Sequence, residues 1–273
     1  MILGTKFNFK FNNTSILFSL PITIFFFFTL LPMLGIVLYT VTATDFLIEI
    51  ANSTVVMAIR LSLTTSFISL LVMILVGTPV AYALARFSFY GRDLLNFLVD
   101  LPLVLPPVVA GLGMLLVFGR EGYVGSWLNN FGITLSFTTW AVILAQIFVA
   151  SPFYVRSAKL GFQSVQVDYE DISRTLGASP WNTFWRISVP LALPSLIGGL
   201  VLAWARAISE FGATLMFAGN FPGKTQTMPL AILTAMERGL VPAFNIALVL
   251  LGISVIVLLL LLTVTKWGRR FTQ

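Results

Sequence analysis

The sequence predicts an all-α integral membrane protein with six spanning helices and a helical cytoplasmic loop. Of its 273 residues, 58% are hydrophobic and only 10% are charged, and the mean hydropathy is +0.98. A soluble domain of this length carries far more charge. Six stretches of at least about 18 residues contain no Asp, Glu, Lys or Arg, so each can form one helix across a hydrocarbon core of roughly 30 Å. Continuous apolar runs favour helices over the alternating strands of a transmembrane barrel.

The six expected spans belong to one transmembrane domain that covers residues 1–273. The first span follows Lys6 and Lys10 and has a Val-Thr-Ala sequence near its end, as a signal peptide does. Its apolar core is longer than the roughly 7 to 15 residues of a cleaved signal, so we expect a retained helix. The expected spans are 16–40, 61–85, 98–118, 135–155, 187–207 and 242–265, and the loop 157–186 joins the fourth to the fifth.

Prolines and glycines predict a bend near the start of the third span. Pro102, Pro106 and Pro107 lack the backbone N–H of a helix interior, and Gly111 and Gly113 permit close contact with another helix. Both features are compatible with ordinary packing and with lining a transport path. The sequence leaves this choice open.

The basic residues predict the orientation in the membrane. With the N-terminus and C-terminus in the cytoplasm, most Lys and Arg residues fall inside, as the positive-inside rule requires. The net charge of +6 is then explained by topology and anionic lipid head groups, and nucleic acid need not be invoked. The inside residues are Lys6, Lys10, Arg86, Arg92, Arg156, Lys159, Arg174, Arg186, Lys266, Arg269 and Arg270.

The absence of two residue types excludes several chemistries. The chain has no Cys and no His, so it has no disulfide, no thiolate or imidazole metal site and no nucleophile activated by histidine. Asp168, Glu170 and Asp171 lie close together, but helix capping explains them more simply than metal binding does. We therefore expect no catalytic residue and no metal site in this chain, which argues against an enzyme.

One segment resembles a phosphate-binding loop. Residues 218–225 read AGNFPGKT, with Ala218 where the first glycine of G-x-x-x-x-G-K-[ST] belongs. The segment follows an apolar helix and not a strand, and Pro222 removes one of the N–H groups that such a loop uses. If ATP drives the protein, we expect another chain to bind it.

The charged and aromatic loop before the fifth span predicts two short helices. Asp168 can cap the first, with the acid three residues later completing a capping box, and Gly177 can end it in the left-handed conformation. Ser179 can cap the second helix, Pro180 suits its first position, and Pro190 limits it. Two capped helices on the cytoplasmic side predict a docking element.

This loop resembles the coupling loop of ABC-importer permeases, whose pattern is Glu-Ala-Ala, three residues, Gly, nine residues and Ile-x-Leu-Pro. Gly177, Ile187 and Pro190 have the required spacing, whereas the Glu-Ala-Ala part is degraded to Asp-Ile-Ser at 171–173. The resemblance implies contact with an ATPase. The residues to which it assigns coupling are Asp168, Glu170, Asp171, Arg174, Gly177, Ala178, Pro180, Trp181, Ile187 and Pro190.

Further blocks resemble the permease of molybdate and tungstate ABC importers. These are LPLVLPPVVAG at 101–111, FGIT at 131–134, SPFYVR at 151–156, RTLGASPW at 174–181 and SEFGATLMFAGNFPGKTQTMPLAI at 209–232. Sulfate/thiosulfate permeases share much of this pattern and are the alternative. A channel that conducts without ATP is a further, less favoured one.

The resemblance implies a homodimer with the path between its two copies, in a plasma or inner membrane or a plastid envelope. Two cytoplasmic ATPase subunits would bind ATP and Mg, an external protein would deliver the oxyanion, and this chain would bind no cofactor.

A charged pair ends the fifth span. Arg206 and Glu210 are four residues apart, the spacing of an ion pair on one helix face. Charged groups at membrane depth usually face a bundle interior or an aqueous cavity. The pair is either structural or, with Ser209, Gly212 and Thr214, borders the gate of the path.

Overall fold

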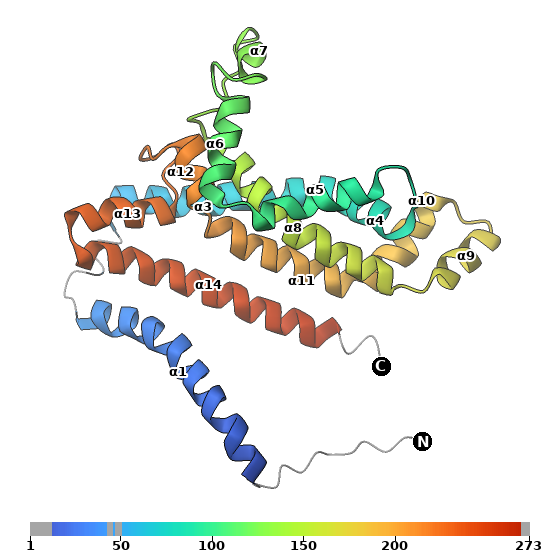
Figure 1. Ribbon diagram of the computed structural model, residues 1–273, viewed down its shortest axis with the longest axis horizontal. Helices are drawn as coiled ribbons and strands as arrows, with labels where there is room; N and C mark the ends of the chain where they lie inside the picture. The colour runs from blue at the N-terminus through green and yellow to red at the C-terminus, as the bar shows by residue number, and fades with distance from the viewer. Residues whose placement is uncertain (1–12, 43–45, 47–50, 269–273) are drawn as a thin grey trace.

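The computed structural model of the chain describes residues 13–42, 46 and 51–268, and all the regular elements within these ranges are helices (Figure 1). Lys6, Lys10, Arg269 and Arg270 lie outside them. The helices are α1 (Asn13–Thr42), α3 (Ser53–Val72), η1 (Met73–Gly77), α4 (Thr78–Arg86), α5 (Arg92–Val104), α6 (Pro107–Phe118), α7 (Gly125–Asn129), α8 (Thr139–Ser164), α9 (Val167–Thr175), α10 (Pro180–Thr183), η2 (Phe184–Ser188), α11 (Val189–Ile208), α12 (Gly212–Ala218), α13 (Met228–Arg238) and α14 (Leu240–Gly268).

Within the described residues, five helices are long and apolar enough to cross a membrane, and six spans result if the bent pair α5 and α6 counts as one. This agrees with the expected all-helical, multi-pass architecture. The five spans are Phe18–Thr42, Ser53–Arg86, Thr139–Ser164, Pro180–Ile208 and Leu240–Leu260.

The third expected span, 98–118, is not one straight helix. The axes of α5 and α6 meet at 117°. Leu105 and Pro106 between them have extended backbone, with ψ of 128° and 131°. Pro106 and Pro107 cause this break, because a proline lacks the helical N–H and drives the residue before it out of the helical region. The predicted bend is therefore a sharp turn that sends α6 across the direction of the other spans (Figure 1).

The fourth and fifth spans extend well into the loop expected at 157–186. Helix α8 continues to Ser164, and α10, η2 and α11 form one continuous helix from Pro180 to Ile208. The loop is thus confined to the short segment that carries α9. Pro190 does not end a helix as predicted. It lies inside the continuous helix, directly after the π-helical turn η2, where the regular hydrogen-bond pattern is already interrupted.

Small residues bring α8 and α11 into close contact. A Cβ on Gly161 would lie 2.5 Å from Cβ of Ser195, and a Cβ on Gly199 would lie 2.6 Å from Cβ of Ser157. The Ser157 hydroxyl also donates a hydrogen bond of 2.8 Å to the Ser195 carbonyl. Close packing of small residues with an interhelical hydrogen bond is a usual way to fix two helices in a membrane.

The described part of the first helix, α1, leans away from the other spans and packs chiefly on α14 (Figure 1). The rings of Tyr39 and Phe244 lie 4.9 Å apart, and the Thr40 hydroxyl donates to the Phe244 carbonyl at 3.5 Å. Elsewhere, the described part of α1 is largely uncovered, with Phe25 and Phe28 more than 70% exposed. This surface is available to lipid or to another protein chain.

The buried apolar side chains form three clusters. One joins α4, α8, η2 and α11, a second joins α6, α8 and α12, and a third joins α3, α13 and α14. Helix α8 takes part in the first two. Elements that pack on the first cluster are therefore connected through α8 to the opposite end of the bundle.

Candidate coupling site

Helix α9 forms the first half of the predicted docking element. It begins at Val167, and the preceding Gln166 makes no side-chain capping bond. The predicted cap by Asp168 is wrong, because this residue already lies inside the first turn. Asp168 and Glu170 still place negative charge near the positive end of the helix dipole, which favours the helix.

The end of α9 is the predicted left-handed glycine stop. Gly177 has φ of +90°, which a glycine adopts without steric cost. Its N–H bonds to the Arg174 carbonyl at 2.9 Å, and the N–H of Ala178 bonds to the Ser173 carbonyl at 3.1 Å. These two bonds form a Schellman motif, which satisfies the last carbonyls of the helix and reverses the chain.

The second half begins as predicted with a serine cap. The Ser179 side chain accepts a hydrogen bond of 3.3 Å from the N–H of Asn182, and Pro180 occupies the first helical position. This helix continues through η2 into α11. The docking element therefore consists of α9, which is a separate helix, and of α10, which is the end of a membrane span. Any displacement of α10 is therefore carried into α11.

A buried cluster, which we call the clamp, ties α9 to two spans. It consists of Arg86 from α4, Glu170 from α9 and Ser188 from η2. The carboxylate of Glu170 accepts bonds of 3.0 Å from Arg86 and 2.7 Å from Ser188, and Arg86 also donates to the Val165 carbonyl at 2.9 Å. The side chains of Arg86 and Glu170 are 9% and 2% exposed. Removing one member of such a pair leaves an uncompensated buried charge, so the clamp holds α9 in place.

An aromatic cluster packs beside the clamp. The Phe184 ring lies 4.8 Å from that of Tyr82 and 6.0 Å from that of Phe162, and Phe184 is buried. Two tryptophans on the same turn are instead exposed, Trp181 by 68% and Trp185 by 51%. Phe184 therefore packs inward, and the two tryptophans remain available for contact with a partner.

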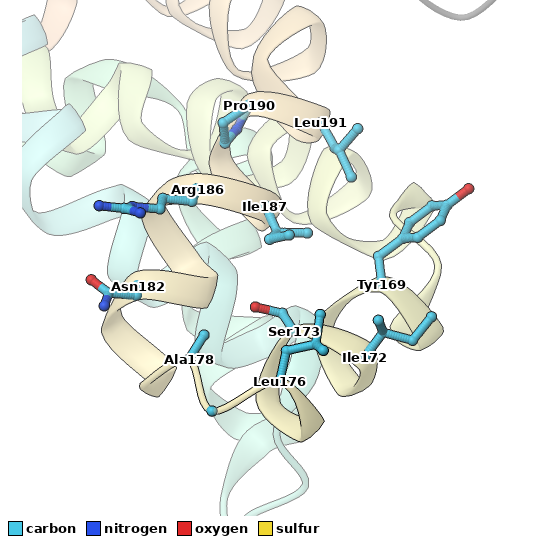
Figure 2. A pocket seen from close by; sticks show the side chains of 11 residues that line it. Tyr169, Ile172, Ser173, Leu176, Ala178, Asn182, Arg186, Ile187, Pro190 and Leu191 are labelled. Carbon is cyan, nitrogen blue, oxygen red and sulfur yellow. The ribbon is translucent and has the colours of Figure 1, made fainter.

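A groove of about 810 Å³ separates α9 from the start of the α10–α11 helix. Figure 2 shows that its two walls come from these two elements, with Tyr169 and Ile172 on one side and Ile187 and Leu191 on the other. The lining residues are Tyr169, Ile172, Ser173, Leu176, Gly177, Ala178, Asn182, Arg186, Ile187, Pro190 and Leu191. The groove is mainly apolar, which suits insertion of a partner's side chains.

The other predicted coupling residues lie on the exposed surface around this groove. Asp171 and Arg174 form an ion pair of 3.7 Å with side chains that are 61% and 45% exposed, so the pair contributes little to stability.

Sequence reasoning missed Arg86 and Ser188. Arg86 marks the end of an apolar stretch, but nothing in the sequence relates it to Glu170, 84 residues away.

The predicted path residues gather where α11 meets α12, but most are buried. Arg206 and Glu210 form an ion pair of 2.7 Å, in which Glu210 is 1% exposed. Glu210 also accepts a bond of 2.8 Å from the N–H of Ala213, so it holds the start of α12. Thr214 is fully buried, whereas Ser209 is exposed. This geometry favours the structural alternative for the pair, and the gate role stays a prediction.

Helix α12 lies tightly against α6. A Cβ on Gly212 would lie 3.1 Å from a Val108 methyl, and a Cβ on Gly111 would lie 2.8 Å from Cα of Ala213. These contacts connect the Arg206–Glu210 pair to the bent third span. A displacement of the end of α11 is therefore passed through α12 to α6.

The segment that resembles a phosphate-binding loop is a turn between two helices. Gly219 and Gly223 both have φ of +74°, and the Phe221 carbonyl accepts bonds from three following N–H groups. Helix α12 precedes the turn, where a phosphate-binding loop has a strand, and α13 begins only at Met228. The turn uses its N–H groups internally, which leaves few of them to hold a phosphate.

Comparison with known families gives a match over most of the chain. Residues 73–267 match the family model described as "Binding-protein-dependent transport system inner membrane component". This region includes the clamp, the groove and both α11 and α12.

Curated relatives cover most of the chain at similar identity. The "Probable transport system permease protein NifC" of Clostridium pasteurianum is 38% identical over 89% of this chain and 85% of its own length. The "Molybdenum transport system permease protein ModB" of Mycobacterium bovis is 44% identical over 75% of this chain and 76% of its own length. The "Sulfate transport system permease protein CysW" of Synechococcus elongatus is 40% identical over 74% of this chain and 71% of its own length.

Solved structures match the fold. A bacterial ABC transporter that imports the acidic polysaccharide alginate has a chain with a TM-score of 0.72 and 18% identity, over 95% of this chain and 96% of that chain. The MetNI methionine ABC transporter has a chain that matches with a TM-score of 0.55 and 16% identity, over 84% of this chain and 97% of that chain. The fold is therefore that of an ABC-importer permease.

Proposed function

Because the chain belongs to the family of binding-protein-dependent transport system inner membrane components, we propose that it is the membrane subunit of an ATP-driven oxyanion importer. Molybdate or tungstate is the substrate we favour. The names of several relatives and the sequence blocks of the molybdate permease pattern support this choice. The observation that carries the proposal is the coupling element itself, a helix and groove fastened to two membrane spans by the buried clamp.

The coupling element faces an ATPase subunit in this proposal. The exposed Trp181 and Leu176 and the apolar groove provide the contact area, and the rigid clamp transmits the movement. ATP and Mg are bound by the ATPase and not by this chain. The α9 end of the bundle, with the end of α14, is then the cytoplasmic side, in agreement with the positive-inside rule.

Two copies of the chain enclose the path, and each docks on one of two ATPase subunits. The uncovered surface of α1 supports a second copy, because a span that is largely uncovered in its own chain can pack against the other. An external binding protein delivers the oxyanion to the side of Arg206 and Ser209. Alternating access then results from rocking of the two bundles when the ATPases close.

Sulfate or thiosulfate is the second candidate, favoured by the 40% identity to the sulfate permease relative. The same fold serves both, because the binding protein supplies most of the selectivity. A channel that conducts without ATP is disfavoured by a coupling element that such a channel does not need.

The test is transport into proteoliposomes that contain the permease, its ATPase and its binding protein. We expect uptake of molybdate and tungstate only with ATP, and ATP hydrolysis stimulated more by binding protein loaded with these anions than with sulfate or thiosulfate. Stimulation mainly by sulfate would replace the substrate assignment. Uptake without ATP would refute the importer.

A further inference from the structure

A small cleft that carries charged side chains lies between α5 and α8, next to Leu84 of α4 and apart from the predicted gate residues. Asn96 and Asp100 of α5 face Arg156, Lys159 and Gln163 of α8 around a cavity of about 160 Å³. The Lys159 ammonium donates a 2.6 Å bond to the Asn96 side-chain oxygen, and the Arg156 guanidinium lies 3.4 Å from the Asp100 carboxylate. The two cations are thus directed into the cleft.

The cleft lies in the half of α8 that leads to α9, among the basic residues expected on the cytoplasmic side. Arg156 lies eight residues before the end of α8, and Asp100 lies eight residues after the start of α5, which places both about 12 Å inside the helix ends. The side chains of Arg156 and Asp100 are nevertheless 59% and 45% exposed on the chain. Charged groups near the end of a span seldom face the lipid core, so this exposed surface favours contact with water or with a second protein.

The charge of the cleft suits a weakly held anion. Arg156 and Lys159 contribute two positive charges and Asp100 one negative charge, which leaves +1 in each copy. Two copies that face each other across the path therefore carry +2 together, which balances the charge of a dianion. Asp100 limits the attraction, which a path needs because a site that holds its ion tightly releases it slowly.

We propose that this cleft, with Arg156 and Lys159, is the inner exit site of the path and binds the tetrahedral oxyanion before its release into the cytoplasm. Arg156 offers a planar fork of donors to two oxygens, and Lys159 acts as a point charge. The inference rests on the proposed function, because it assigns the residues that receive the transported anion.

The first test removes the charges and measures molybdate uptake in the reconstituted complex. Arg156→Gln with Lys159→Gln should lower the uptake rate about tenfold, the lower end of what focused charge contributes to local ion concentration. Lys159→Arg should stay within about twofold, since the charge is kept. Arg120→Gln is the matched control, because it removes an exposed charge in the loop after α6. Wild-type activity in the double variant would overturn the exit site, whereas a wild-type complex without uptake would instead refute the proposed function.

The second test keeps the charges and does not depend on activity. The chain has no Cys, so Gln163→Cys introduces a single thiol beside Arg156 and Lys159. An anionic thiosulfonate reagent should modify it in the nucleotide-free complex, and molybdate should slow that modification. Tyr90→Cys in the exposed turn between α4 and α5 is the control, which the reagent should modify at a rate that molybdate does not affect. A thiol at 163 that the reagent does not reach, or that molybdate does not protect, would contradict the proposal even if the charge variants failed to assemble.

Discussion

Two neighbouring acids on α9 show how burial decides the role of a residue. Glu170 is 2% exposed and bonds to Arg86 and Ser188, whereas Asp171 is 61% exposed and has only a long ion pair with Arg174. Asp171 occupies the motif position of the glutamate, yet Glu170 carries the structural connection. The exposed acid is free to contact a partner, and the buried one holds the helix that presents it.

Glu170→Ala should therefore be far more harmful than Asp171→Ala. Loss of Glu170 leaves Arg86 as an unpaired buried charge, which costs about 3–5 kcal/mol of folding free energy, and the exposed pair of Asp171 is worth no more than about 1 kcal/mol. Unfolding of the detergent-solubilised complex measures the difference. Arg86→Leu with Glu170→Leu should lose less than the sum of the two single variants. Equal effects at positions 170 and 171 would show that the clamp is not important.

Gly177→Val tests the stop of α9. A side chain there would meet no atom within 4 Å, so the cost comes from the backbone, where φ of +90° is strained by about 1–2 kcal/mol for a residue with a Cβ. We expect the variant to enter the membrane normally but to lose ATP hydrolysis coupled to transport. Gly132→Val is the matched control, because Gly132 also has positive φ and open space around it, in the loop before α8. Normal coupling in Gly177→Val would remove α9 from the coupling role.

At the scale of elements, the close pair α8 and α11 is the stiff connection between the two ends of the molecule. The clamp and the aromatic cluster attach the coupling element to one end of this pair, and Glu210 attaches α12 to the other. Because α10, η2 and α11 are one helix, a push on the groove reaches Arg206 without crossing a flexible loop. The contact between α12 and α6 passes this displacement on to the bent third span.

Two adjacent glycines of α11 test this connection. A Cβ on Gly199 would lie 2.6 Å from Cβ of Ser157, whereas a Cβ on Gly198 would meet nothing within 4 Å. Gly199→Val should separate α8 from α11 and destabilise the protein by about 1–3 kcal/mol, the usual cost of overpacking. Gly198→Val should have a much smaller effect. Thermal unfolding in detergent measures both, and equal shifts would show that the contact is not tight.

At the scale of the molecule, the described part of one chain leaves three surfaces uncovered. The described part of α1 is almost entirely uncovered, the groove is open, and the charged cleft between α5 and α8 faces outward. In the proposed assembly these three surfaces face, respectively, the second copy, the ATPase and the path. Each side of the bundle thus has a different partner.

The assembly predicts a fixed stoichiometry. The complex purified in detergent should contain two copies of this chain and two ATPase subunits, and its mass by light scattering or native mass spectrometry should fit this composition. Replacing Phe25 and Phe28 on α1 with Ala should reduce recovery of the dimer, because these large side chains would lose burial against the other copy. The same replacement at Leu258 and Leu259 of α14 is a control of similar exposure. A complex with a single permease chain would contradict the path between two copies.

Local patterns were sufficient for much of this protein. Hydropathy alone determined an all-helical membrane protein, and local chemistry determined the glycine stop at Gly177 and the serine cap at Ser179. These features depend on interactions within one turn or on transfer of a whole segment into lipid, so neighbouring residues are enough to predict them. Only the tertiary structure decided that Glu170 pairs with Arg86 and that α10 continues into α11, and it set the angle of 117° for the bend that the prolines predict. Such features depend on which helices lie side by side, and contacts between residues far apart in the chain carry no signal in a single sequence.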